Sequence, residues 1–117
     1  MPEESIDIGD LDTKLTELGR LIEQTQIEDP AYRPARVLKR NLGTEPQTPD
    51  DIFTDKIDLA LQHQRIGWLL LKRGQINPDS LSERMLTAIS GDLEIARLHF
   101  STAKEFRGRV PSERLKY

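Results

Sequence analysis

The sequence of 117 residues contains no cysteine, only 5% aromatic residues and no long apolar run. Without cysteine the chain has no disulfide, no thiolate metal ligand and no cysteine nucleophile, and a reducing compartment suits it. A membrane-spanning helix needs about 20 apolar residues, and no stretch approaches that length. The acidic start MPEESIDIGD also lacks the basic flank and the apolar core of a signal peptide. These absences predict a cytoplasmic protein.

Charged residues are abundant and unevenly distributed. They make up 32% of the chain, against 36% hydrophobic residues, a balance typical of a helical bundle with solvated outer faces. Residues 1–61 hold 7 basic and 14 acidic residues, or −7, whereas residues 62–117 hold 10 and 6, or +4, which gives the net charge of −3. A chain of this length has room for one domain. We expect the acidic and basic halves to pair with each other within it. The acidic balance disfavours general nucleic-acid binding.

Four apolar residues near the start follow the period of a helix that lies on a partner. Their spacings are 4, 3 and 4, and Asp10 stands where it can cap the first turn. The pattern predicts a helix over residues 10–27, preceded by a flexible acidic segment over residues 1–9. The four residues are Leu11, Leu15, Leu18 and Ile22.

Two prolines interrupt the chain after this helix. Pro30 and Pro34 lack an N–H and clash with a preceding helical turn, so a linker must separate two helices. Because Pro34 suits a first turn and Gly43 suits the position after a last turn, the sequence predicts a short helix over residues 34–42. This segment is locally basic through Arg33, Arg36, Lys39 and Arg40.

The sequence TPDD at residues 48–51 is typical of a helix start. It offers a threonine cap, a proline for the first turn and acids for the positive end of the helix dipole, and it predicts a helix over residues 49–73. Apolar positions begin as a stripe and are nearly all-round by residues 66–71, which indicates burial on most sides or contact with a partner. We predict partner binding by Leu11, Leu15, Leu18, Ile22, Ile66, Trp68 and Leu69.

The last predicted helix spans residues 78–107. Gly91 lies inside its apolar pattern, where the close approach of another helix would explain a glycine. Gly108 and Pro111 are expected to end the helix and to leave a flexible basic tail over residues 108–117. Its apolar residues recur at steps of three and four without a shift of phase: Leu81, Met85, Ile89, Leu93, Ala96, Phe100 and Ala103.

These patterns together predict an all-α fold. Neither strand-like alternation nor an internal repeat covering most of the chain appears. We expect a small helical bundle built on a long antiparallel helical hairpin, formed by the helices over residues 49–73 and 78–107 and covered by the other two. The single domain is expected to span residues 10–107.

Few features of the sequence indicate a catalytic site. His63 and His99 are the only imidazoles, and neither has a partner at a metal-ligand spacing. No glycine-rich phosphate loop, nucleophile elbow or catalytic-lysine signature occurs, so we predict that the chain is not an enzyme and takes no cofactor or metal. Two acidic pairs stand at predicted helix starts, where capping explains them: Asp50 with Asp51, and Asp10 with Asp12.

One stretch resembles a known family. The sequence RIGWLLLKRGQINPDSL, residues 65–81, is similar to a motif in the N-terminal domain of secretion and type IV pilus assembly ATPases. In that motif a basic residue, an apolar residue and glycine precede two apolar residues, then Gly-x-Ile at a turn and a second helix. The family binds cyclic di-GMP through tandem copies of the motif, of which this chain has one. The resemblance implies ligand contacts at Arg65, Gly67, Leu70, Leu71 and Gly74.

Helix capping offers another interpretation of the same stretch. Gly74 can take a left-handed cap, Ile76 can pack back on the helix, and Asn77-Pro78 can begin the next helix. This interpretation expects another helix to cross close to Gly67. Ligand binding would instead require an open pocket bounded by Arg65 and Gly74.

The sequence thus favours a non-catalytic interaction, adaptor or assembly module that binds a protein partner, or a second copy in a homodimer, through an apolar helical face. The alternative is a small regulatory domain that binds a cyclic dinucleotide, cyclic di-GMP, at residues 65–81. Nucleic-acid binding through the basic tail is the least favoured class, because the basic residues of the tail are dispersed and lack interleaved aromatic residues.

Overall fold

The computed structural model describes residues 7–43 and 47–114, and for residues 108–114 it describes the backbone alone. These residues form four α-helices and one short 3₁₀ turn, with no strand among them, so the predicted all-α class is confirmed. In chain order the elements are α1 (Ile8–Glu28), α2 (Pro34–Leu42), α3 (Pro49–Ile76), the 3₁₀ turn η1 (Pro78–Ser80) and α4 (Glu83–Arg114). No helix in this part of the chain is both long enough and apolar enough to cross a membrane.

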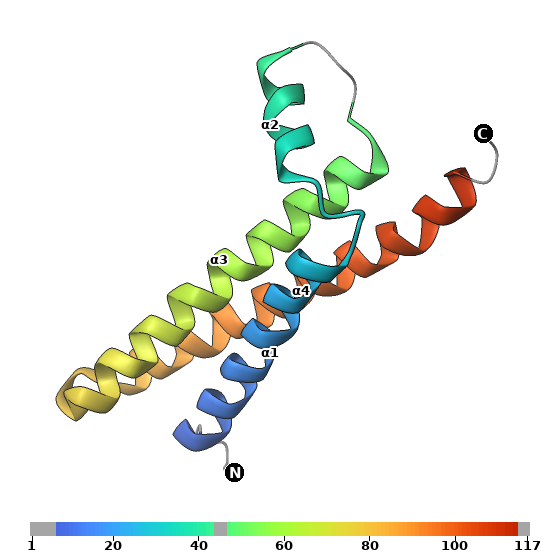
Figure 1. Cartoon of the computed structure of the whole chain (residues 1–117). Helices are drawn as coiled ribbons and strands as arrows, with labels where there is room; N and C mark the ends of the chain where they lie inside the picture. Colours follow the sequence, from blue (N-terminus) through green and yellow to red (C-terminus); the bar gives the residue numbers. More distant parts are fainter. Residues whose placement is uncertain (1–6, 44–46, 115–117) are drawn as a thin grey trace.

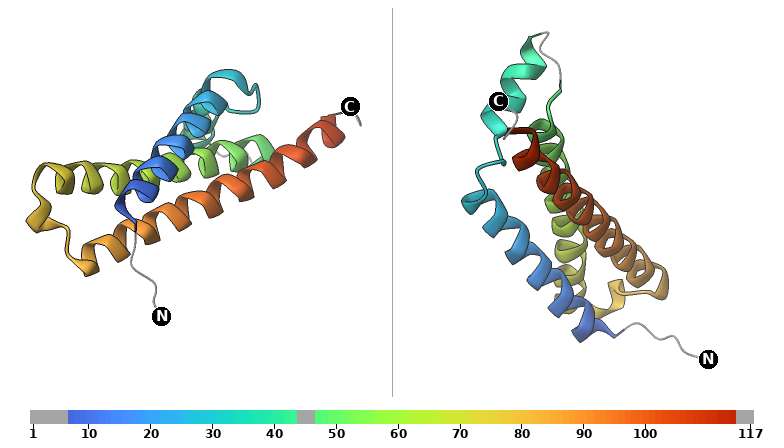
Figure 2. Two further views of the ribbon diagram at one scale, coloured as in Figure 1. Left: turned by 90° about the horizontal axis from the view of Figure 1, so that it is seen from below. Right: turned by 90° about the vertical axis from the view of Figure 1, so that its right-hand side faces the viewer.

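The helices α3 and α4 form the predicted antiparallel hairpin, and α1 lies across it (Figure 1). In both views of Figure 2, α3 and α4 run beside each other along the longest dimension of the molecule, and α1 packs on one side of the pair. The short α2 packs against α3 beside its first turns. The molecule is elongated, with extents of 55 × 30 × 22 Å.

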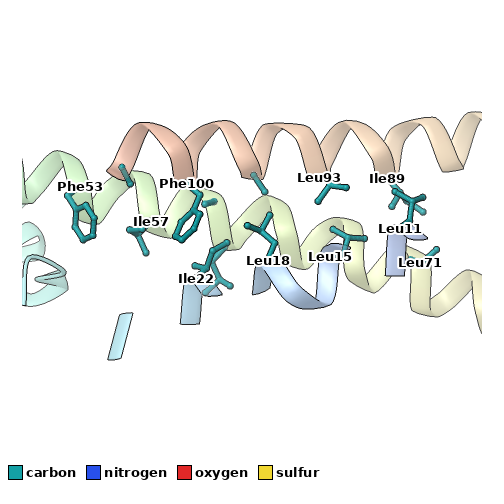
Figure 3. Packing of buried hydrophobic residues seen from close by; sticks show 14 of the residues in the cluster. Leu11, Leu15, Leu18, Ile22, Phe53, Ile57, Leu71, Ile89, Leu93 and Phe100 are labelled. Carbon is teal, nitrogen blue, oxygen red and sulfur yellow. The ribbon is translucent and has the colours of Figure 1, made fainter. Parts of the chain in front are cut away.

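Apolar side chains from the three long helices fill the core (Figure 3). On α3 the inward residues are spaced 4, 3, 4, 3, 4 and 3, the heptad pattern of helices that pack along their whole length. We call them the inner seam: Phe53, Ile57, Ala60, Gln64, Gly67, Leu71 and Gly74. They face the α4 residues Ile89, Leu93, Ala96, Phe100 and Ala103, and the α1 residues Leu11, Leu15, Leu18 and Ile22.

Gly67 lies where the three long helices meet. A Cβ added there would lie 3.2 Å from Asp92 Cβ and 3.4 Å from Leu15 Cδ2. Since side chains of α4 and α1 approach this closely, the expected helix crossing at Gly67 is present. A glycine inside a helix costs about 1 kcal/mol relative to alanine, and here it provides the space for close packing.

The predicted left-handed cap at Gly74 is wrong. The helix α3 continues to Ile76, and no described glycine has a positive φ. Gly74 is buried because the Leu81 side chain occupies the space that a Cβ would take. Ile76, expected to pack back, is 86% exposed. Glycine at this position therefore matters for its small size, which lets Leu81 pack against α3, and not for its conformational freedom.

Other helix ends also differ from the predictions. The cap of α1 is Asp7, whose carboxylate accepts a hydrogen bond from the Asp10 N–H at 3.1 Å, so Asp10 lies inside the helix. The helix α4 begins at Glu83 and not at residue 78, with the Ser82 hydroxyl accepting from the Met85 N–H at 3.1 Å. Its backbone continues to Arg114, beyond the end predicted at Gly108. Of the predicted flexible ends, residues 1–6 and 115–117 lie outside the described residues.

Gly91 has no neighbour to explain it. No heavy atom outside its own stretch of helix lies within 4 Å of the position that its Cβ would take. The predicted close helix approach at Gly91 is therefore wrong, because this side of α4 faces open space. The start of α3 follows its prediction fully: Thr48 and Asp51 form a reciprocal capping box, with Pro49 in the first turn.

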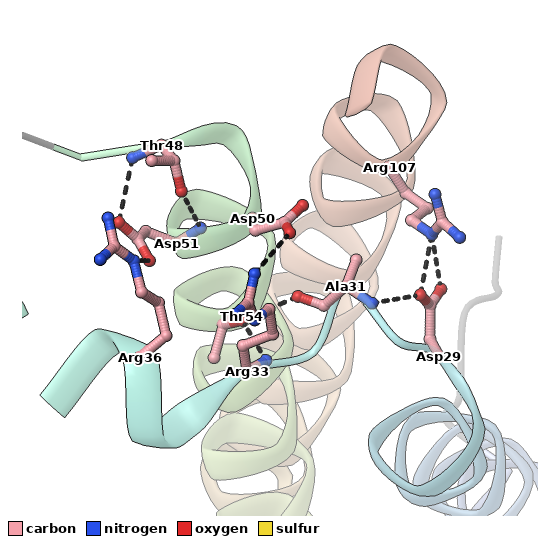
Figure 4. Close-up of polar contacts among 9 residues, drawn as sticks. All are labelled: Asp29, Ala31, Arg33, Arg36, Thr48, Asp50, Asp51, Thr54 and Arg107. Carbon is pink, nitrogen blue, oxygen red and sulfur yellow. Dashed lines mark hydrogen bonds and ion pairs between the residues drawn. The ribbon is translucent and has the colours of Figure 1, made fainter. Parts of the chain in front are cut away.

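Polar contacts attach the linker and α2 to the hairpin (Figure 4). Asp51 is completely buried at the start of α3 and lies 3.2 Å from Arg40 Nε. The buried Thr54 hydroxyl donates to the Ala31 carbonyl at 3.2 Å and accepts from the Arg33 N–H at 2.8 Å. Arg107 of α4 donates through Nε to both carboxylate oxygens of Asp29, at 2.8 and 3.0 Å. These contacts fix where the chain leaves α1 and enters α2.

Candidate functional site

The solvent-facing side of α3 bears a second series of residues at heptad spacing. Steps of 3, 4, 3, 4, 3, 4 and 3 place them on one stripe of the helix, away from the inner seam. Its apolar members are partly or largely open to solvent: Ile66 is 42% exposed, Leu69 59% and Ile76 86%. We call this stripe the outer seam: Ile52, Asp55, Leu59, Gln62, Ile66, Leu69, Arg73 and Ile76.

Two shallow hollows flank the middle of the outer seam. One, of about 500 Å³, lies between α1 and α3 and includes Trp68. The other, of about 560 Å³, includes Ile66 and lies beside Gln26 of α1. Arg65 and Leu69 line both hollows, so they form the ridge that separates them. A ridge between two hollows is the shape that receives the side chains of another helix on both of its sides.

The floor of the first hollow depends on a small residue of α1. Gln64 is buried and donates from Nε2 to the Leu15 carbonyl at 2.8 Å. A Cβ on Gly19 would overlap the Gln64 side chain, so Gly19 allows that amide to reach the α1 backbone. The sequence interpretation missed both residues, although a glycine in the predicted helix beside Leu18 was an available signal. Together they fix the position of α1 beside the outer seam.

Charged groups surround the ridge. Arg65 lies 3.3 Å from Glu23 of α1, with both side chains more than half exposed, so this pair contributes little to stability. Lys72 donates to Asp12 of α1 at 2.9 Å and lies 5.6 Å from the centre of the Trp68 ring. Hydrogen bonds from Gln75 and then from Lys72 lower the pKa of Asp12.

At the other end of the second hollow, Asp58 accepts a hydrogen bond from the Tyr32 hydroxyl at 2.7 Å and from Gln26 Nε2 at 3.2 Å. Burial, together with the neighbouring Asp58 carboxylate, raises the pKa of Tyr32 to about 12. The phenol therefore stays protonated at neutral pH and acts as a hydrogen-bond donor. The Asp58 side chain is exposed and has further acceptor capacity.

The residues predicted to bind a partner separate into two groups. Ile66 and Leu69 are exposed on the outer seam, and Trp68 is half-buried beside it. The four residues of the first helix are buried between α1 and the hairpin, with exposed fractions of 7% or less: Leu11, Leu15, Leu18 and Ile22. Their apolar stripe packs on the chain's own α3 and α4, so in this structure it is not an outward surface.

The residues that the family resemblance singled out are not gathered at one place. Gly67, Leu71 and Gly74 are spaced 4 and 3 and are buried on the inner seam. Arg65 is exposed on another side of α3, and Leu70 is half-buried. Neither hollow beside Arg65 includes Gly67 or Gly74.

The two histidines lie together between α3 and α4. His63 Nδ1 is 3.3 Å from Asp92 Oδ1, and the His63 and His99 rings are stacked with their centres 5.8 Å apart. Burial lowers the pKa of His99, with further contributions from Lys56 and His63. Within the described ranges, no group of three or more histidine or carboxylate side chains is arranged to hold a metal ion.

Comparison with known proteins gives no family for this chain: no protein-family model, no curated protein and no solved structure matches it.

Proposed function

We propose that this chain is a non-catalytic protein-interaction module that binds its partner through the outer seam of α3. The observation that supports this proposal most strongly is the exposure of Ile66 and Leu69 on a ridge between two hollows. An exposed leucine by itself is common, but large apolar residues at heptad spacing lie on one side of the helix, where a single partner can contact several of them. Such a stripe fits a partner that presents a helical apolar face.

The energetics favour this surface as a binding site. Fully burying an exposed leucine or isoleucine side chain contributes about 1.5–3 kcal/mol. Ile66 and Leu69 have 42% and 59% of their surface left to bury. The two together therefore contribute about 1.5–3 kcal/mol toward the roughly 8 kcal/mol of a micromolar affinity. The opposite side of α3 is packed against α1 and α4, which holds the helix in place before the partner arrives. A rigid helix loses less conformational freedom on binding than a flexible segment would.

A capture experiment tests the proposal. The immobilised chain is exposed to a lysate of its native host, and bound proteins are compared between the wild type, Leu69→Glu and Leu98→Glu. Leu98 is a matched control because it is 64% exposed, lies on α4 and lines neither hollow. We expect one set of partners to be retained by the wild type and by Leu98→Glu and lost by Leu69→Glu.

Helical circular dichroism of all three proteins checks that the substitutions leave the fold intact. Equal retention of every bound protein by folded Leu69→Glu would contradict the proposal, because a charge at the centre of an apolar interface carries a large desolvation cost.

A further inference from the structure

We propose that the outer seam is covered by a second copy of this chain, with the two α3 helices antiparallel. This inference rests on the proposed function and names its partner. The seam runs from Ile52 to Ile76, a rise of about 36 Å along the helix. A surface of that length and of heptad spacing is matched by another long helix, and α3 of a second copy has the required length.

The charges on the exposed side of α3 favour an antiparallel copy. On the outer seam and its flank toward α1, acidic residues come first, at Asp55 and Asp58, and basic residues follow, at Arg65, Lys72 and Arg73. Lys56 lies on the opposite flank, near His99 of α4. A parallel copy would place like charges beside each other, whereas an antiparallel copy places the acidic end of one helix against the basic end of the other. The two helix dipoles also oppose each other in the antiparallel arrangement.

The charges on the seam define a register in which its apolar residues also meet. If Asp55 of one copy lies opposite Arg73 of the other, the two-fold axis crosses the outer seam between Gln62 and Ile66, at the level of residue 64 along the helix. Leu59 then lies opposite Leu69, since these two residues have the same midpoint. Ile52 lies opposite Ile76, and Gln62 opposite Ile66. The register that pairs opposite charges is thus also the register that pairs leucine with leucine and isoleucine with isoleucine.

The charged groups at these positions are open to a second copy. Arg73 is exposed and forms no ion pair with any described residue. The Asp55 side chain is 39% exposed; Arg40 lies 3.8 Å from its Oδ2 and Gln47 donates to that same oxygen at 3.4 Å, which leaves Oδ1 for a second cation. Arg65 meets its own copy near the two-fold axis, but each Arg65 lies beside Glu23 of its own chain, which offsets the repulsion between them.

Engineered cysteines can test the register directly, because the chain has none of its own. Leu59→Cys and Leu69→Cys are prepared as separate proteins, mixed and oxidised mildly. We expect a mixed disulfide between Cys at 59 of one copy and Cys at 69 of the other. Each variant alone should crosslink poorly, because identical positions are then about 15 Å apart along the axis, whereas a disulfide needs Cα atoms within about 7 Å.

Sedimentation equilibrium over a range of concentrations gives the mass of the unmodified chain. We expect the mass of two chains for the wild type and for Leu98→Glu, and the mass of one chain for Leu69→Glu. Arg73→Glu should weaken the dimer about tenfold or more, because it replaces two attractive contacts with two repulsive ones in each dimer. Circular dichroism confirms that each variant is folded.

The outcomes separate this inference from the proposed function. A wild type that is monomeric at every concentration, or a dimer that persists in Leu69→Glu, would overturn the second-copy assignment. Homodisulfides from the separate cysteine variants, without a mixed one, would indicate a parallel pair and overturn the antiparallel assignment. If the chain is monomeric but host proteins are still lost with Leu69→Glu, only this inference fails. If Leu69→Glu changes neither mass nor capture, both fail.

Discussion

The two seams of α3 have the same spacing and different composition. The inner seam combines large apolar residues, such as Phe53, with glycines at Gly67 and Gly74, and α1 and α4 fill the space around it. The outer seam has Asp55 and Arg73 among its apolar residues, and its central side chains are exposed. Heptad spacing therefore identifies a helix surface suited to packing, but the mixture of small, large and charged residues indicates which kind of packing. A tight intramolecular core uses glycine, and a surface that must also remain in water uses charge.

The largest expected difference between the seams is in stability. Phe53 is 1% exposed, so Phe53→Ala should lower the free energy of unfolding by about 3–5 kcal/mol through lost burial and a residual cavity. Leu69→Ala on the outer seam should change it by less than about 0.5 kcal/mol in the monomer. Urea unfolding of dilute protein measures both, and equal losses would mean that Leu69 is part of the core.

Replacing Gly67 and replacing Gly91 with larger residues should change the stability of the chain in opposite directions. Gly67→Leu is expected to destabilise the chain by about 1–3 kcal/mol, because Asp92 and Leu15 lie against the space that the new side chain needs. Gly91→Ala should instead stabilise it by about 0.5–1 kcal/mol, since its Cβ meets open space and alanine favours the helix. Thermal unfolding of the two variants checks this pair. A destabilising Gly91→Ala would indicate a neighbour that the structure does not contain.

A smaller, pH-dependent effect on stability is expected from Asp12 of α1, which accepts hydrogen bonds from Lys72 and Gln75 of α3. Its pKa is lowered in the folded state below the ordinary value of 3.8, so the carboxylate stabilises the fold above that value. This contribution is lost as the pH falls through the lowered folded pKa. Asp12→Asn should therefore be less stable than the wild type at neutral pH, and the difference should shrink as the pH falls below 3.8. The exposed Asp79→Asn serves as the control, and a gap that widens in acid would contradict the assignment.

The smallest effect is expected from cyclic di-GMP. Three of the five residues that the family resemblance implies are buried on the inner seam, so their backbone is covered by neighbouring helices. We expect isothermal titration calorimetry with cyclic di-GMP to give no binding heat. Saturable heat that disappears in Arg65→Ala would place a ligand site at Arg65, and would favour the regulatory function over the interaction module.

Local chemistry made several features predictable. The helix over residues 34–42 was predicted with the observed bounds, because Pro34 suits a first turn and Gly43 follows the last one. The capping box at Thr48 was equally visible, since the cap and its partner lie three residues apart. Both depend on neighbours in sequence, so no knowledge of the rest of the fold was needed.

Features that depend on distant residues were not predictable in this way. Gly74 resembles a helix cap in sequence, yet Leu81 occupies its free side and α3 continues past it. The four apolar residues of α1 matched a partner-binding stripe equally well, because an amphipathic helix has the same pattern whether its partner is in the same chain or in another. For the same reason, the nearly all-round apolar stretch at residues 66–71 could not be divided between core and surface.

The sequence by itself determined that this chain is helical and where most of its helices lie, because periodicity and caps are local properties. Only the tertiary structure decided which face of each helix is covered. It placed Leu15 and Gly67 in the core, left the side chains of Ile66 and Leu69 exposed to solvent, and buried the apolar face of α1 against α3 and α4. The physical reason is that burial is a property of two surfaces, and the second surface comes from residues far away in the chain.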